Sequence, residues 1–98
     1  MSSVQKTYPI PGKSTADCYE AALEAYPKAG FEIWKKRELA YMLMAKCSGK
    51  DGQIDSNLMA RFGSPTQIVL IVSAENLPEA DLQPYLDKIY AAFKAVLG

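Results

Sequence analysis

The stretch FEIWKKRELAYMLMAKCSGKDGQIDSNLMARFGSPTQIVLIVSA, which runs from Phe31 to Ala74, decides the fold of this chain. It divides into four segments of strand length, rich in alternating apolar residues, at residues 31–37, 39–47, 53–62 and 66–74. Glycine-containing turns at residues 49–52 and 63–65 separate the last three segments, and Arg37-Glu38 separates the first two. We therefore predict an antiparallel meander of four strands.

Another strand and two helices flank this meander. Residues 4–10 alternate in strand fashion, and the prolines around their end place this strand at a sheet edge. The run Ser14-Thr15-Ala16-Asp17 resembles a capping box and predicts a helix that ends near Gly30. A last helix is predicted with Asp81 as its N-cap. Its apolar residues recur at helical spacing, at Leu82, Leu86, Ile89, Phe93 and Leu97.

The predicted order β-α-β-β-β-β-α describes an α+β two-layer sandwich, in which both helices cover one face of a mainly antiparallel sheet. This order resembles that of TATA-binding-protein-like domains and of small helix-grip domains. The resemblance extends over the whole chain, but in topology only, and it assigns no site residue. We expect a single domain over residues 1–98, and folds of this kind serve many tasks.

The register of the strands can be predicted from one pair of opposite charges. If Lys46 faces Asp55 across the second hairpin, the two charges attract each other. The same register sets Met42 opposite Met59, Met44 opposite Asn57, Met59 opposite Val69, and Asn57 opposite Ile71. For the first hairpin, we place Trp34 opposite Met42.

This register makes both faces of the sheet apolar. The face away from the helices collects Trp34, Met42, Met44, Met59, Val69 and Ile71, with Asn57 and Arg61 among its polar residues. A sheet covered on one side ordinarily alternates apolar and polar residues. Six large apolar side chains left in water would forgo several kcal/mol of burial free energy. We therefore predict that these eight residues form a binding surface or an interface.

Three kinds of cover would suit this face. The first is a second copy of the chain, and it is favoured because closed homodimers are the commonest oligomers. The second is a different protein or a peptide, which methionine-rich surfaces accommodate well. The third is an apolar small molecule held against Trp34, with Arg61 and Asn57 making polar contacts. In a fourth interpretation, strong twist places the methionines in the core and no such surface exists.

Charge and composition argue against several other functions. Eleven basic and eleven acidic residues give a net charge of zero, whereas nucleic-acid binding and anionic membranes favour a basic excess. The chain has no histidine, which is the commonest general base and metal ligand. We predict no catalytic residue, no metal and no cofactor, and we interpret Cys18 and Cys47 as buried, unreactive thiols. Whether the chain is an enzyme stays open, with a non-enzymatic role favoured.

These observations lead to a small soluble domain, expected in the cytoplasm because a secretory signal is not recognisable. Its favoured function is a non-enzymatic interaction domain that homodimerises through the apolar sheet face. The alternative is a small domain that binds an apolar ligand at Trp34. The sequence does not identify the ligand, the partner or the cellular process.

Overall fold

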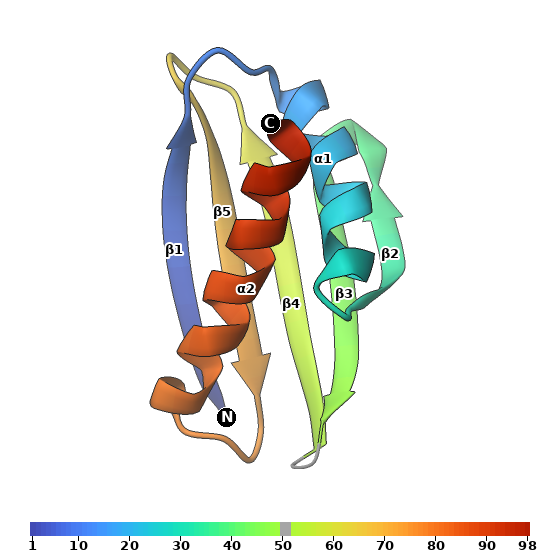
Figure 1. The fold of residues 1–98 in the computed structure, drawn as a ribbon, viewed down its shortest axis with the longest axis vertical. Coiled ribbons are helices and arrows are strands. Elements are labelled where there is room, and N and C mark those ends of the chain that lie inside the picture. The colour runs from blue at the N-terminus through green and yellow to red at the C-terminus, as the bar shows by residue number, and fades with distance from the viewer. Residues whose placement is uncertain (50–51) are drawn as a thin grey trace.

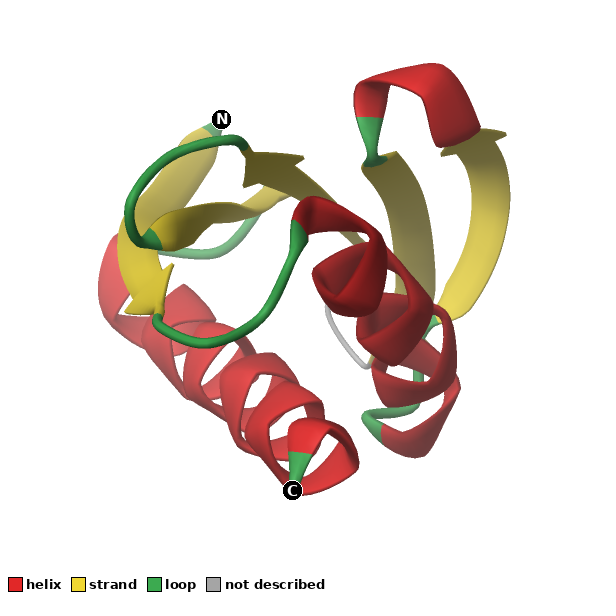
Figure 2. Cartoon of the chain, turned by 90° about the horizontal axis from the view of Figure 1, so that it is seen from above, coloured by secondary structure: helices red, strands yellow, loops and turns green. Residues whose placement is uncertain are grey.

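The computed structural model describes residues 1–49 and 52–98, and it shows two helices packed on one antiparallel five-stranded sheet (Figure 1). The strands are β1 (Ser2–Ile10), β2 (Glu32–Arg37), β3 (Met42–Gly49), β4 (Gly52–Arg61) and β5 (Thr66–Ala74). The helices are α1 (Thr15–Lys28) and α2 (Glu79–Leu97), and the short 3₁₀ turn η1 (Glu38–Ala40) joins β2 to β3. The predicted α+β sandwich, with both helices on one face, is confirmed (Figure 2).

The capping box predicted for α1 is present. The Ser14 hydroxyl accepts a hydrogen bond from the Asp17 backbone N–H at 3.0 Å, and the Asp17 carboxylate accepts one from the Ser14 N–H at 3.0 Å. The hydrogen bond from the Ser14 backbone N–H, together with a smaller contribution from the Ser14 side chain, holds the pKa of the Asp17 carboxyl below its usual value. After the helix, Gly30 has a φ of 85°, which lets the chain turn into β2.

The start of α2 corrects the predicted N-cap. The cap is Pro78 rather than Asp81, and the helix begins at Glu79. Pro78 has the extended backbone of a cap residue, and its carbonyl accepts the Asp81 N–H at 3.0 Å. Asp81 therefore lies inside the first turn, where a carboxylate interacts favourably with the helix dipole.

The core lies between the helices and the sheet. Its largest fully buried side chains include Tyr26, Phe93, Leu43, Ile54, Leu58, Ile68, Leu70, Leu82, Leu86 and Ile89. One polar chain crosses it, in which the Tyr26 hydroxyl lies 2.9 Å from the Ser56 hydroxyl, which in turn donates to the Ile71 carbonyl at 2.9 Å. These hydrogen bonds link α1 to β4 and β5 in a region where an unpaired polar group would be costly.

The predicted register holds in the two central hairpins and fails in the first. β3 and β4 place Lys46 opposite Asp55, and the predicted pairs between β4 and β5 are also present. However, Met42 lies opposite Arg37 rather than Trp34. The connection is longer than the expected reversal at Arg37-Glu38, because η1 and Tyr41 follow β2 before β3 begins. An irregularity between Ile33 and Lys35 shifts the pairing further.

β1 and β2 are the edge strands of the sheet. The edge position predicted for the first strand is confirmed, and it carries Pro9, which lacks a backbone donor. β2 carries Lys35, Lys36 and Arg37, as well as the irregularity after Ile33. None of the helices in residues 1–49 and 52–98 is long and apolar enough to cross a membrane.

Candidate functional site

The candidate site is the sheet face away from the helices, which we call the outer face. Side chains alternate along a strand, so each buried core residue is followed by one that points outward. Among the described residues, both helices lie on the opposite side of the sheet, and no strand lies over the outer face (Figure 2). The methionines are therefore not part of the core, which excludes the interpretation based on twist.

The centre of the outer face is an apolar strip across three adjacent strands. This apolar strip consists of Met42 and Met44 on β3, Met59 on β4, and Val69 and Ile71 on β5. Val69 is 8 % exposed because its neighbours surround it, whereas the other four are half-buried. The register brings together five of the six predicted apolar residues on one continuous surface.

Polar residues interrupt and border the apolar strip. Asn57 lies within it, opposite Met44 on one side and Ile71 on the other. Asp55 lies on one side of the strip along β4, and Arg61, which is exposed, lies on the other side at the end of the strand. An apolar centre with a polar rim is the usual anatomy of a protein interface.

Trp34 does not join these rows. It lies at the irregularity between Ile33 and Lys35, where the register gives it no partner on β3, and it is 54 % exposed. Lys35 lies opposite Met44, and Arg37, rather than Trp34, lies opposite Met42. The side chain predicted opposite Met42 is therefore in the edge strand, outside the paired rows.

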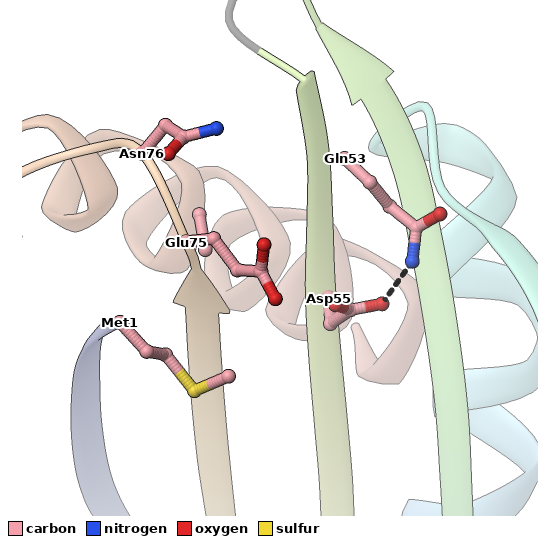
Figure 3. Close-up of a pocket in the computed structure, with 6 residues that line it drawn as sticks. Met1, Gln53, Asp55, Glu75 and Asn76 are labelled. Carbon is pink, nitrogen blue, oxygen red and sulfur yellow. Dashed lines mark hydrogen bonds between the residues drawn. The ribbon is translucent and has the colours of Figure 1, made fainter.

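Among the pockets on the surface of residues 1–49 and 52–98 are three that neither Trp34 nor the apolar strip lines. One of about 280 Å³ lies beyond the end of the apolar strip and is lined by Met1, Gln53, Asp55, Ala74, Glu75 and Asn76 (Figure 3). Within it, the Gln53 side-chain amide donates to the Asp55 carboxylate at 2.8 Å. This hydrogen bond orients the acidic end of the outer face.

A second pocket was not anticipated from the sequence. It has about 230 Å³ and lies between α1 and the β2–β3 connection, with Tyr19, Leu23, Lys36 and Tyr41 among its lining residues. Tyr41 has a φ of 50°, which is unusual for a bulky residue, and its ring contacts those of Tyr19 and Phe62 edge-on. Single-sequence patterns carry no signal for this arrangement, because it depends on contacts between distant segments.

The described residues offer little reactive chemistry. Burial raises the pKa of the Cys18 thiol, which is fully buried, and that of Cys47, which is half-buried. A raised pKa lowers the fraction of nucleophilic thiolate at neutral pH. Within residues 1–49 and 52–98, we find no cluster of three or more acidic or thiol side chains arranged to hold a metal ion.

Comparisons with known proteins identify the fold and no family. No family model matches the chain, and no curated protein matches it. The solved structure of Ara h 8.0201 is similar, with a TM-score of 0.75 and 14 % identity over 99 % of this chain and 95 % of that chain. A DUF4468 family protein from Bacteroides ovatus is similar with a TM-score of 0.62 and 9 % identity, over 98 % of this chain and 85 % of that chain. At these identities the likeness shows the fold alone, which is helix-grip-like.

Proposed function

We propose that the chain acts as a single, non-enzymatic interaction domain that forms a homodimer through its outer face. The observation that carries this proposal is the apolar strip, which no helix or strand among the described residues covers. Leaving it in water would cost several kcal/mol relative to burial. That cost is a large part of the stability of a small domain, so a partner that covers the strip gains substantially.

The size of the surface sets the expected strength of association. Three adjacent strands about 4.8 Å apart and about 30 Å long present roughly 400 Å² per copy. Two copies would then bury about 800 to 900 Å², which is below the size of stable specific interfaces and within the range of weak, transient ones. We therefore expect a reversible dimer with a dissociation constant in the micromolar range.

The free cysteines bear on where the protein works. Cys18 and Cys47 form no disulfide with each other, and both are at least half-buried. Disulfides are rare in the cytosol, and free buried thiols persist there. These features support the cytoplasm as the location in which the domain acts.

Substitution of Met59 by lysine tests the proposal. Met59 is half-buried at the centre of the apolar strip and outside the core, so Met59→Lys should leave the fold intact. In a dimer the added ammonium group would be desolvated without a partner, which is costly. We expect sedimentation velocity at tens of micromolar to show a dimer for the wild type and a monomer for Met59→Lys.

A control introduces lysine on the opposite layer of the molecule. Ala91 is exposed on α2, so Ala91→Lys should remain dimeric. A wild-type chain that is monomeric at these concentrations, and unaffected by Met59→Lys, would refute self-association.

The alternative of an apolar ligand at Trp34 has less support, because Trp34 lines none of the three pockets. A ligand-induced shift of Trp34 fluorescence in such a monomer would favour it.

A further inference from the structure

We infer that the two copies associate about a two-fold axis perpendicular to the strands, so that Asp55 of each copy faces Arg61 of the other. The inference rests on the proposed function, and it adds the arrangement of the copies and the residues that determine it. It follows from the positions of charged and apolar residues on the outer face, which the strand register gives.

On β4, the outer-face positions lie symmetrically about Leu58, with Asn57 and Met59 as the inner pair and the opposite charges of Asp55 and Arg61 as the outer pair. Asp55, Asn57, Met59 and Arg61 point outward in turn, because alternate residues of the strand are buried. A two-fold axis that crosses β4 at Leu58 exchanges position 57 with 59 and position 55 with 61. Each Asp55 carboxylate then meets the Arg61 guanidinium of the other copy, and this occurs once on each side of the axis.

The same axis also exchanges outer-face residues on the neighbouring strands β3 and β5. Leu43, Leu58 and Leu70 are register partners, so one line across the sheet passes through all three. About this line, Met42 on β3 exchanges with Met44, and on β5 Val69 exchanges with Ile71. The apolar strip therefore maps largely onto itself. An interface between identical copies requires this self-complementarity.

The ends of β5 fit the same arrangement. The axis exchanges Gln67 with Ser73, which are both outer-face residues on β5. Their side chains offer hydrogen-bond donors and acceptors to each other across the interface. The same two-fold axis therefore makes the polar rim residues of β4 and those of β5 complementary between the two copies.

The competing arrangement places the axis along β4. Each outer-face residue of β4 would then face the same residue of the other copy, so that Asp55 meets Asp55 and Arg61 meets Arg61. Like charges brought together at an interface oppose association. That arrangement would also pair the two Asn57 amides and the two Met59 side chains, but these two favourable contacts are set against two repulsive charge pairs.

The two charged residues are suitably placed within each copy. The Asp55 carboxylate is oriented by the Gln53 amide at 2.8 Å (Figure 3), and Lys46 lies opposite it on β3. Arg61 is exposed, and its register partner on β5 is the uncharged Gln67. The guanidinium of Arg61 is therefore available to a carboxylate of a second copy, with which it can form a strong charged hydrogen bond.

Charge reversal and charge exchange test the arrangement. We expect Arg61→Glu and Asp55→Arg, each alone, to raise the dissociation constant of the dimer about tenfold or more, because each turns two attractive pairs into repulsive ones. The double variant Asp55→Arg/Arg61→Glu should return to within about threefold of the wild type, because opposite charges face each other again. Analytical ultracentrifugation gives the dissociation constants.

Two controls make the outcomes distinguishable. Lys88→Glu reverses a charge on α2, on the other side of the molecule, and should leave the dimer unchanged. Thermal unfolding of every variant verifies that it is folded. A dimer that either single substitution leaves unchanged or strengthens, or that the double variant does not restore, overturns the arrangement and leaves the proposed function standing. A monomeric wild type would instead overturn the proposed function itself.

Discussion

Two buried tyrosines on α1 differ in one respect, which makes them a natural pair for comparison. The Tyr26 hydroxyl is hydrogen-bonded to Ser56, whereas the buried Tyr19 hydroxyl has no partner among the described residues. We predict that Tyr26→Phe lowers the free energy of unfolding by about 1 kcal/mol, the usual net value of a hydrogen bond. Tyr19→Phe should cause no loss, because it removes an unsatisfied polar group.

Urea denaturation of both variants measures these free energies. The substitution is chemically identical and lies on the same helix in each case, so the difference reports on the hydrogen bond alone. Equal losses in the two variants would show that the contact between Tyr26 and Ser56 contributes nothing to stability.

The same tyrosine gives a pH dependence with a definite sign. Burial raises the pKa of the Tyr26 hydroxyl, although its hydrogen bond to Ser56 acts in the opposite direction. The unfolded chain therefore loses this proton first, starting near pH 10. The contribution of the Tyr26 proton to the free energy of unfolding should be fully present below about pH 10, and the stability should decrease as the pH rises above it. Thermal unfolding from pH 8 upward, roughly over the range in which tyrosine titrates, should show a smaller decrease in Tyr26→Phe than in the wild type.

At the scale of elements, the capping box of α1 supplies the next prediction. Ser14 bonds the Asp17 backbone N–H that would otherwise lack a helical partner. We expect Ser14→Ala to lower the free energy of unfolding by about 1 kcal/mol. Ser3→Ala, at an exposed position on β1, is the control and should change stability little. Chemical denaturation followed by circular dichroism compares the two, and equal effects would rule out a capping contribution.

Elements joined by short, glycine-containing turns were predictable from the sequence. The β3–β4 and β4–β5 hairpins have such turns, and the pair Lys46 and Asp55 selected the correct register. Lys50 and Asp51, in the first of these turns, lie outside the described residues. The apolar strip was predictable for the same reason, because its residues all come from these three strands.

The β2–β3 connection was not predictable. Tyr41 adopts a left-handed backbone, which glycine or asparagine would have signalled and tyrosine does not. Its N–H donates to the Glu38 carbonyl at 3.1 Å, and its carbonyl accepts from the Ala60 N–H at 2.9 Å. These bonds, one of them to a distant strand, hold a turn that displaces Trp34 from its predicted row.

At the scale of the whole molecule, the core and the outer face lie on opposite sides of the sheet. The helices and the inner side of the sheet form the core, and the edge-strand residue Tyr8 stacks on Tyr90 of α2 at 3.6 Å between ring centroids. The outer face takes no part in that core, so its side chains can change without loss of the fold. This independence allows outer-face residues to be tested by substitutions that change their charge.

The edges of the sheet have a consequence for how large an assembly can grow. Proline on β1, together with the basic residues and irregular pairing of β2, hinders the strand-to-strand addition that builds filaments. A face-to-face dimer covers the apolar strip of both copies, so growth through this surface terminates at two chains. We predict that light scattering at increasing concentration reaches the mass of a dimer and then stays constant. A mass that keeps rising would reveal a second self-association surface, and the chain would then form open-ended polymers rather than a closed dimer.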